Sequence, residues 1–411
     1  MARIIMKFGG TSVSDVDHIA NVAKSVKLEC DSGNQIAVVV SAMAGMTDQL
    51  VNHVNSISTK FDGKEYDTVV TAGEQITCGL LALALQEAGI SARSFLGWQI
   101  PIKTDDVFGK ARIKNIDTKE LEKCLAAGTV TVVPGFQGVT TDSRITSLGR
   151  GGSDTSAVAL AAALRADRCD IYTDVNGVYT TDPRIVPLAR KLDYVTYEEM
   201  LEMASLGAKV LQPRSVELAM KQNVRIQVRS SYHVNQNGTL VVDEEEVLEQ
   251  ELVRGIAYSR DEAKITLVGL ENRPGIAASI FGPLADAGIN VDMIVQNVSA
   301  NNKHADLTFT VAKSDLTNAI NTLETWRAEN KLEDIFQDSA VCKVSVVGVG
   351  MRSHAGVAQK MFRTLADKGI NIEVISTSEI KVSVLIADEY TELAVRALHT
   401  AYDLDGDADL P

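Results

Sequence analysis

The sequence predicts an α/β fold, in which a mostly parallel sheet sandwiched by helices is followed by two copies of a small α+β module. Two observations support this prediction. About the first 230 residues alternate near-continuous apolar runs with helical patterns, which is typical of parallel sheets buried on both faces. The later residues contain two stretches that resemble each other. At 411 residues the chain is long enough for two or three domains.

The elements of the first part alternate in order along the chain. Apolar runs predict strands at residues 3–8, 35–43, 129–136 and 169–175. Helical spacing predicts helices at residues 16–28, 72–88 and 153–166. In sheets of this kind ligands bind beyond the carboxyl ends of the strands, where the Gly-rich turns of this sequence fall. An acidic stretch that ends near residue 251 indicates a solvated linker or a surface helix.

The second part consists of an internal repeat, since residues 268–294 resemble residues 347–375. Three pairs of residues are each 81 positions apart: Gly275 and Gly356, Gly288 and Gly369, and Asn290 and Asn371. Each copy predicts a strand, a Gly-containing loop, a helix ended by Gly and a second strand, followed by a further strand at 304–311 or 381–387. This period is too long for a solenoid, so we expect two modules that pack against each other, because each alone buries little apolar area.

The composition excludes several classes of protein. A net charge of −14 argues against a nucleic-acid partner, which needs a basic face, although local N–H groups and lysines can still hold small anions. The five cysteines are scattered without a CxxC pair, which indicates reduced thiols and no zinc site. The N-terminus lacks an apolar signal region, and the longest apolar run, 157–164, is too short to span a membrane. We therefore expect a soluble cytoplasmic protein.

The first candidate site is the turn Lys7-Phe8-Gly9-Gly10-Thr11-Ser12, which follows the first predicted strand. Glycines let the backbone approach an anion, successive N–H groups form an anion-binding nest, and lysine adds a charge. The turn is not a Walker A loop, because its lysine precedes the glycines. Taken alone, this stretch favours an ordinary turn after a strand.

The second candidate site is the stretch 147–160. Two glycines followed by Ser153 as an N-cap would present a helix N-terminus, which binds anions. Asp154 has an alternative explanation as a first-turn acid that complements the helix dipole. Arg150 is not explained in that way, and its guanidinium suits bidentate capture of a carboxylate or phosphate.

Three further stretches have structural explanations that compete with functional ones. Thr71 and Glu74 fit a capping box, which this stretch alone favours, although Glu74 would also suit a substrate ammonium group. Residues 172–186 end a strand in a polar loop, which is a natural nucleotide site but, taken alone, more often a plain turn. Ser41 and Thr47 follow an apolar strand, where their hydroxyls would contact phosphate or substrate or belong to a surface turn.

Together these stretches closely resemble the amino-acid kinase family, and the resemblance covers essentially the whole chain. It rests on the ordered motifs KFGGTS (7–12), SAM (41–43), GE (73–74), GRGGSDT (149–155) and TDVNGVYTTDPR (173–184), with the block 198–219. The repeated modules resemble the ACT domains of this family, which have βαββαβ topology and bind amino-acid effectors. The implied domains are a catalytic domain (1–245), a linker with a first strand contributed to the second ACT module (246–263), ACT module 1 (264–340) and ACT module 2 (341–411).

The resemblance implies transfer of the γ-phosphoryl group of ATP to the side-chain carboxylate of L-aspartate, giving 4-phospho-L-aspartate and ADP, with Mg²⁺ accompanying the nucleotide. This would be the first step of lysine, threonine and methionine biosynthesis. The residues implied in catalysis are Lys7, Asp154 and Glu74. Those implied to bind the substrate are Thr47, Glu74, Arg150, Gly151, Gly152 and Ser153. Those implied to bind the nucleotide are Lys7, Phe8, Gly9, Gly10, Ser41, Thr173, Asp174, Tyr179, Thr181, Asp182, Arg184 and Lys209. No protein residue is predicted to bind a metal directly.

The resemblance also implies feedback inhibition by lysine, threonine or both. The effector residues that it implies are Asp292, Met293, Ile294, Gln296, Asn297, His354, Ala355, Asn371, Ile372, Thr377 and Ser378. Among them, Asp292 is expected to meet a cationic end of the effector. The second module has His354-Ala355 where the first has Arg273-Pro274, so the two sites need not be equal. A purely structural dimerisation module is the alternative, and a homodimer or homotetramer through the ACT modules is expected.

Two other functions stay open at this point. Another kinase of the same family would act on glutamate, acetylglutamate or a nucleoside monophosphate, which the ACT pair and the combination of Glu74 with Arg150 disfavour. A catalytically inactive amino-acid sensor is disfavoured because Lys7, Asp154 and Asp174 are all present.

Overall fold

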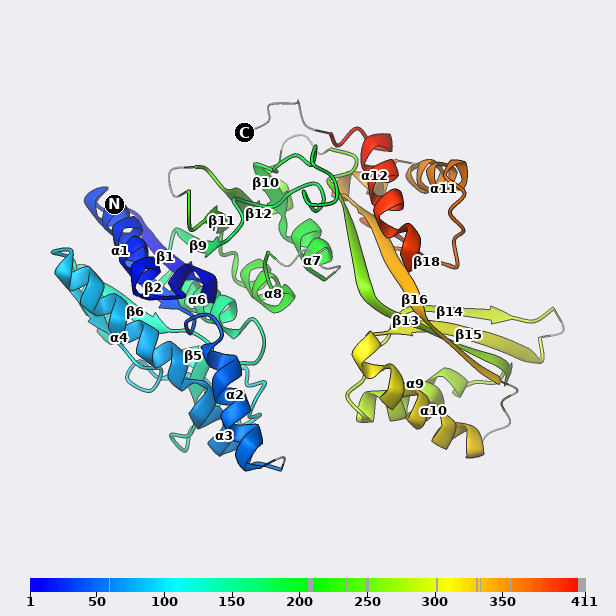
Figure 1. The fold of residues 1–411 in the computed structure, drawn as a ribbon, viewed down its shortest axis with the longest axis horizontal. Helices are drawn as coiled ribbons and strands as arrows, with labels where there is room; N and C mark the ends of the chain where they lie inside the picture. The colour runs from blue at the N-terminus through cyan, green and yellow to red at the C-terminus, as the bar shows by residue number, and fades with distance from the viewer. Residues whose placement is uncertain are drawn as a thin grey trace. The chain divides into compact units, whose positions relative to one another are not determined.

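The computed structural model consists of two compact units (Figure 1). It describes residues 1–58, 60–205, 210–233, 236–247, 251–300, 302–329, 332, 334–354 and 356–405. Within these residues, the first unit comprises 1–178, 191–205 and 210–247, and the second comprises 179–190 and the residues from 251 onward. Two predicted site residues, Lys209 and Ala355, lie outside the described residues.

The first unit is built on an eight-stranded sheet in the order β10-β12-β11-β9-β1-β2-β6-β3. Its strands are β1 (Arg3–Phe8), β2 (Gln35–Val40), β3 (Ala92–Ser94), β6 (Val130–Pro134), β9 (Arg168–Thr173), β10 (Tyr194–Thr196), β11 (Ile226–Ser230) and β12 (Thr239–Val242). β1 lies between β2 and β9 and is parallel to both. Of the strand pairs described, β11 with β12 alone is antiparallel. The predicted mostly parallel sheet is confirmed.

Helices cover both faces of this sheet (Figure 1). On one face, α1 (Val16–Asp31) and α4 (Ala72–Glu87) pack against Met6 and Phe8 of β1 in one apolar core. Since side chains alternate along a strand, Lys7 points to the opposite face, where it reaches α6 (Gly152–Leu164). The other helices of this unit are α2 (Met46–Ile57), α3 (Gly63–Val70), α5 (Lys119–Ala126), α7 (Tyr197–Ser205) and α8 (Pro213–Gln222).

A second, four-stranded sheet in the first unit was not predicted from the sequence. Its order is β5-β4-β7-β8. The strands are β4 (Ile102–Thr104), β5 (Ile113–Ile116), β7 (Gln137–Val139) and β8 (Ile145–Ser147). Strands this short show no readable alternation of apolar and polar residues, so sequence patterns miss them. The sheet matters for function because β8 leads directly into the Gly-rich loop before α6.

One helical run, residues 63–87, would be long and apolar enough to cross a membrane by length and composition alone. Half of its most apolar window is buried within the unit, as in the core helix of a globular protein. The run consists of two helices, α3 and α4, that meet at Thr71. It is therefore weak evidence for a membrane span.

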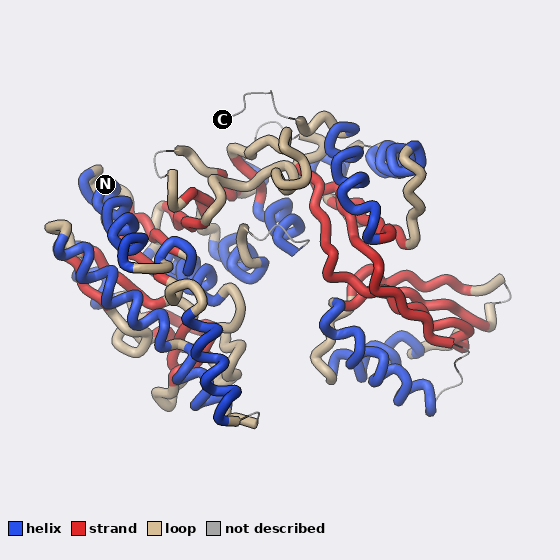
Figure 2. Tube along the Cα trace, in the orientation of Figure 1, coloured by secondary structure: helices blue, strands red, loops and turns tan. Residues whose placement is uncertain are grey.

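The second unit is built on a six-stranded antiparallel sheet in the order β14-β15-β13-β16-β18-β17. Its strands are β13 (Gly255–Glu271), β14 (Asp292–Val298), β15 (His304–Val311), β16 (Asp334–Val347), β17 (Val374–Thr377) and β18 (Lys381–Ala387). The long strands β13 and β16 serve both halves of the sheet (Figure 2). Residues 255–259 of β13 pair with 343–347 of β16 beside β18, and residues 264–268 pair with 334–338 beside β15.

Two helices pack on each half of this sheet, which confirms the predicted pair of α+β modules. They are α9 (Ile276–Asp286) and α10 (Leu316–Glu329) on the first, and α11 (Val357–Asp367) and α12 (Thr391–Ala401) on the second. The repeat is visible in the helix bounds, because α9 starts directly after Gly275 and α11 directly after Gly356.

The second unit also contains residues 179–190, which come from the middle of the predicted catalytic domain. Ile185 and Val186 of this segment lie in the apolar core of the second module. Thr180 is hydrogen-bonded to the fully buried His399, with 2.8 Å between Oγ1 and Nε2, and the other ring nitrogen of His399 lies 2.9 Å from Asp405 Oδ1. Burial lowers the pKa of His399. The segment is thus an integral part of this unit.

Candidate active site

A cavity of about 430 Å³ in the first unit lies where β1 and β2 end. Ligand sites of open parallel sheets occur at this edge. The predicted site residues that line it are Lys7, Gly10, Ser41, Thr47, Glu74, Arg150, Gly151, Gly152, Ser153 and Asp154. Four stretches that are far apart in the sequence therefore meet around one cavity. Ala42, Met43 and Gly149, which belong to the motifs named above but were assigned no role, also line it. The lining residues that sequence reasoning missed are Ala44, Gly45, Asp48, Phe136 and Gln212.

Lys7 and Asp154 form a buried ion pair in the cavity wall. Lys7 Nζ lies 2.6 Å from Asp154 Oδ1, and the two residues are 9% and 7% exposed. Asp154 belongs to the first turn of α6, so the dipole explanation applies to it, but that explanation does not account for the lysine. A buried cation held in place by a carboxylate is a preorganised charge for an anionic ligand.

The N-terminus of α6 forms another wall of the cavity. The helix begins at Gly152, with Gly151 before it as its N-cap, so the prediction that Ser153 caps the helix is wrong. Gly151 has φ of +71°, and a Cβ there would lie 2.2 Å from Cγ of Gln212, so both the backbone and the packing require glycine. The glycine places the positive end of the helix beside the exposed guanidinium of Arg150. This wall suits a carboxylate or a phosphate.

Glu74 contributes a buried carboxylate to the cavity and is 4% exposed. Burial raises the pKa of Glu74 to about 7, partly offset by hydrogen bonds from the backbone N–H groups of Glu74 and Ala42. Among the described residues, its Oε2 atom has no hydrogen-bond partner. A buried acceptor without a partner is costly, and a cationic ligand group would satisfy it.

The capping box predicted at Thr71 and Glu74 is wrong. Thr71 has αR backbone angles, its side chain makes no cap hydrogen bond, and its hydroxyl donates to the carbonyl of Asp67 at 2.8 Å. Because α3 runs almost directly into α4, the start of α4 is not an isolated helix end that needs a side-chain cap. Glu74 is therefore left to face the cavity.

The remaining predicted phosphate-side residues of this unit lie at the ends of β1, β2 and β9. Ser41 follows β2 and its backbone N–H donates to the carbonyl of Phe8 at 3.1 Å. Phe8 stacks on Tyr172 with 4.5 Å between ring centres, and the Gly9 N–H donates to the Tyr172 carbonyl. Thr173 and Asp174, hydrogen-bonded to each other at 3.0 Å, come directly after this tyrosine.

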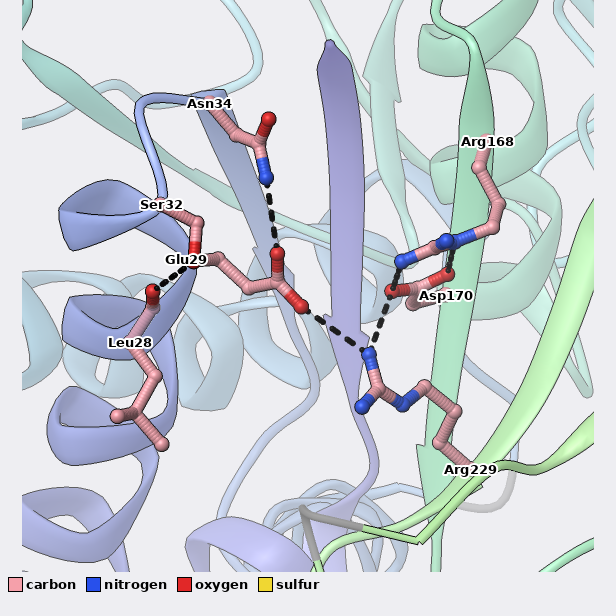
Figure 3. Close-up of polar contacts among 7 residues, drawn as sticks. All are labelled: Leu28, Glu29, Ser32, Asn34, Arg168, Asp170 and Arg229. Carbon is pink, nitrogen blue, oxygen red and sulfur yellow. Dashed lines mark hydrogen bonds and ion pairs between the residues drawn. The ribbon is translucent and has the colours of Figure 1, made fainter. Parts of the chain in front are cut away.

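A partly buried ionic cluster, with the fully buried Asp170 at its centre, lies beside Tyr172 on the α1 side of the sheet. Figure 3 shows Glu29 of α1, Asp170 and Arg168 of β9 and Arg229 of β11 pointing toward one another. Arg229 Nη1 lies 3.1 Å from Glu29 Oε1 and 3.3 Å from Asp170 Oδ2, and its guanidinium lies 5.4 Å from the Tyr172 ring centre. Arg168 contacts both carboxylate oxygens of Asp170. Sequence reasoning missed this cluster, although alternating charges in an apolar strand were a signal for it.

The other predicted nucleotide residues that the structure describes belong to the second unit. Asp182 and Arg184 pair with each other at 2.7 Å, and this contact holds the pKa of Asp182 below its usual range. Tyr258 also donates to Asp182 at 3.3 Å. Thr181 is buried, and Tyr179 is the first residue of the segment 179–190. Their role toward a nucleotide, like that of Lys209, stays a prediction.

The predicted effector residues fall on the two outer strands of the second unit and the loops beside them. Those in the described part are Asp292, Met293, Ile294, Gln296 and Asn297 on β14, with His354, Asn371, Ile372, Thr377 and Ser378 near α11 and β17. Asp292 already has an internal cation, because Oδ2 lies 2.7 Å from Nζ of the buried Lys343. Glu373, which lies 81 positions after Asp292, pairs with Lys264 in the same manner. A cationic effector group would therefore have to compete with Lys343 and Lys264 for the carboxylates of Asp292 and Glu373.

Comparison with known proteins defines the class of the chain. Residues 2–230 match the family model described as the amino acid kinase family, and residues 265–325 and 344–402 match an ACT domain model. The aspartokinase of Pseudomonas aeruginosa is 54% identical over 410 residues, which covers 99% of both chains. Fold and site thus define a small-molecule kinase followed by two ACT domains.

Solved structures agree with this class over nearly the whole chain. Aspartokinase III of E. coli in complex with aspartate and ADP has a TM-score of 0.81 at 28% identity, covering 97% of this chain and 99% of that one. Its complex with lysine and aspartate gives a TM-score of 0.77 at the same identity, covering 97% and 98%. The chain belongs to the amino acid kinase family, within its aspartate kinases, and is an enzyme.

Proposed function

We propose that this chain transfers the γ-phosphoryl group of ATP to the side-chain carboxylate of L-aspartate, producing 4-phospho-L-aspartate and ADP. One observation carries the proposal: a single cavity holds a buried Lys7–Asp154 pair, a buried carboxylate at Glu74 and a helix N-terminus beside Arg150. An amino acid with an anionic side chain has complementary groups, namely an ammonium, an α-carboxylate and a second carboxylate. The E. coli relative was solved with aspartate and ADP, which supports this choice.

In the proposed mechanism the cavity orients two anionic reactants. Arg150, Ser153 and the first N–H groups of α6 hold the α-carboxylate, and Glu74 holds the ammonium group. The side-chain carboxylate of the substrate is already ionised at neutral pH, so no general base is needed. Lys7 stabilises charge on the transferring phosphoryl group, and Asp154 fixes the position of Lys7. Catalysis then consists of in-line positioning and charge neutralisation.

The nucleotide side of this unit is proposed to use the turn after β1 and the end of β9. The residues are Lys7, Phe8, Gly9, Gly10, Ser41, Thr173 and Asp174, with Thr47 on the substrate side. No cluster of three His, Cys, Asp or Glu side chains suited to a metal occurs among the described residues. Mg²⁺ is proposed to enter with ATP, where phosphate oxygens and water would hold it, and it would neutralise phosphate charge.

The proposed pairing of Glu74 with the substrate ammonium predicts a pH dependence. Burial raises the pKa of Glu74 to about 7, and only the ionised form attracts a cation. We expect kcat/KM for aspartate to fall as the pH drops below 7, by up to roughly tenfold per pH unit. In the enzyme–substrate complex the substrate ammonium stabilises the ionised Glu74 carboxylate and so lowers its pKa. The fall in kcat should therefore occur at a lower pH than the fall in kcat/KM. Without substrate, the contribution of Glu74 to the free energy of unfolding should fall as the pH rises from 4.5 to about 7. In this range Glu74 is ionised in the unfolded chain and protonated in the folded one.

Initial rates between about pH 6 and pH 8 would test this pH dependence in the chain and in Glu74→Gln. The variant should have a lower kcat/KM for aspartate with no step near pH 7. A step of the same size in Glu74→Gln would assign the titration to another group.

We further propose that lysine, threonine or both inhibit the enzyme by binding to the ACT modules. The E. coli structure with lysine supports this, and so does the duplication of the module. Inhibition would follow from a difference in effector affinity between two arrangements of the chain. We also propose a homo-oligomer assembled through the ACT modules, a place in the cytoplasm, and a role at the start of lysine, threonine and methionine synthesis.

The experiment that tests both proposals is ADP release with Mg-ATP and L-aspartate, repeated with lysine, threonine and both together. Turnover with aspartate that falls with an effector is the expected result. Glutamate, N-acetylglutamate and a nucleoside monophosphate serve as competing acceptors. Turnover with one of these and none with aspartate would contradict the proposed reaction. Turnover with aspartate that neither amino acid changes would contradict the proposed inhibition.

A further inference from the structure

Asp67 is a fully buried carboxylate in α3 that does not line the cavity. Among the described residues, its side-chain oxygens accept hydrogen bonds from Gly109 and Ser147. The Gly109 N–H lies 3.1 Å from Oδ1 and 2.9 Å from Oδ2, the Ser147 hydroxyl lies 2.7 Å from Oδ1, and the Ser147 N–H lies 2.7 Å from Oδ2. A buried carboxyl group needs hydrogen-bond donors around it, and two N–H groups and one hydroxyl supply them here. Asp67 therefore ties these two backbone positions firmly together.

The two positions held by Asp67 belong to the segments that support the Gly-rich loop. Ser147 ends β8, and the loop residues 149–152 that follow it line the cavity. Gly109 belongs to the turn that lies against the start of this loop, because a Cβ on Gly149 would come within 3.0 Å of the Gly109 carbonyl oxygen. Fixing Gly109 and Ser147 thus fixes where the loop begins.

Arg214 of α8 holds the same two segments through their carbonyl groups. Its Nη1 donates to the Leu148 carbonyl at 2.6 Å, and its Nη2 donates to the Ala111 carbonyl at 2.7 Å. Leu148 follows Ser147, and the Ala111 N–H donates to the Ser147 carbonyl at 3.0 Å. A carboxylate therefore binds the N–H groups of this junction and a guanidinium binds its carbonyls.

We propose that Asp67 and Arg214 are positioning residues that set the place of loop 149–152, and through it the place of Arg150 and the N-terminus of α6. They act on binding of the amino-acid carboxylate, because this loop is the wall of the cavity that suits it. The inference rests on the proposed function, which assigns Arg150 to that carboxylate. A displacement of about 1 Å in a positioning group can change kinetics up to about a hundredfold, so small shifts of this junction are measurable.

The test is steady-state kinetics of the full chain with Mg-ATP and aspartate for Asp67→Asn and Arg214→Met. In Asp67→Asn, one acceptor oxygen becomes an NH₂ group that faces the N–H donors of the junction. We expect the KM for aspartate to rise roughly tenfold to a hundredfold in both variants, with the KM for ATP within about twofold of that of the unchanged chain. Arg214→Lys, which keeps the charge but not the fork that spans two carbonyls, should restore part of the affinity.

Glu199→Gln is the matched control. Glu199 is a fully buried carboxylate of α7 in the same unit, accepts a hydrogen bond from the Thr196 N–H at 3.1 Å and does not line the cavity. This variant should lose thermal stability without a change in either KM. A general structural effect of removing a buried charge would raise the aspartate KM of Glu199→Gln as well, and that result would overturn the inference.

Arg150→Met, measured alongside, separates the inference from the proposed function. A raised aspartate KM in Arg150→Met together with unchanged values in Asp67→Asn and Arg214→Met would overturn the inference alone. An unchanged KM in Arg150→Met would overturn the assignment on which it rests. Where Asp67→Asn does not fold, Arg214→Met decides, since a folded Arg214→Met with an unchanged aspartate KM contradicts the positioning role.

Discussion

Replacing Lys7 by methionine is expected to lower kcat by roughly 10²–10³-fold while the chain keeps its fold. Lys7 lies at the carboxyl end of β1 in the cavity, with its ammonium 2.6 Å from Asp154 Oδ1. Removing one preorganised group that stabilises charge in the transition state costs about this factor. Methionine keeps most of the length of the buried side chain, so packing should change little, but the buried Asp154 loses its cation, which is expected to cost about 3–5 kcal/mol of stability. The measurement is ADP release at saturating Mg-ATP and aspartate, with circular dichroism as a check on folding.

Lys27→Met is the matched control for Lys7→Met. Lys27 is a half-exposed lysine of α1 whose contact with Asp31 is a weak surface pair at 3.8 Å, and its replacement should leave kcat unchanged. Asp154 is proposed to act through Lys7, so Asp154→Asn combined with Lys7→Met should cost little more than Lys7→Met alone. A kcat for Lys7→Met within about threefold of that of the unchanged chain would remove Lys7 from the proposed mechanism.

The sequence was most informative where apolar runs are long and where segments repeat. The runs at 3–8, 304–311 and 381–387 match the bounds of β1, β15 and β18. β1 and β18 are buried along nearly their whole length, whereas exposed and buried residues alternate in the first half of β15, and both patterns indicate a strand. The spacing of 81 residues predicted the two modules of the second unit. Four of the stretches with candidate motifs meet at the cavity, but residues 172–186 do not line it. The ends of β1 and β2 lie together because carboxyl ends of parallel strands share one edge of a sheet.

Predictions from the sequence failed where contacts between distant segments decide the structure. Thr71 matched a capping pattern, but its hydroxyl bonds to Asp67, because α3 precedes α4 with almost no break. The internal cation of Asp292 comes from Lys343, 51 residues away, and no local pattern indicates that pairing. Gln212 lines the cavity because α8 packs against the loop at Gly151, and its own neighbours in the sequence give no such signal. Local patterns name candidate groups, and only the fold assigns their partners.

Replacing Arg229 by methionine is expected to lower the free energy of unfolding of the first unit by about 3–5 kcal/mol, the usual cost of breaking a buried ion pair. Arg229 lies between Glu29 and the fully buried Asp170 (Figure 3). Burial raises the pKa of Asp170, while Arg168 and Arg229 counteract this effect. Without Arg229, two carboxylates would remain beside one guanidinium. The measurement is urea unfolding followed by tryptophan fluorescence in a Trp326→Phe background. Trp98, which lies in the first unit, is then the only tryptophan of the chain, so the signal reports on that unit.

The comparison that makes the Arg229 result specific is a double-mutant cycle. Combining Arg229→Met with Glu29→Gln should cost less than the sum of the single changes, because the second change removes one of the carboxylates left without a partner. Arg144→Met breaks a surface pair with Glu65 and should lose no more than about 1 kcal/mol. Strict additivity in the cycle, or an equal loss in Arg144→Met, would show that Arg229 acts through packing of its side chain. Because Arg229 also lies over Tyr172, which stacks on Phe8, the same variant should weaken binding of ATP more than binding of aspartate.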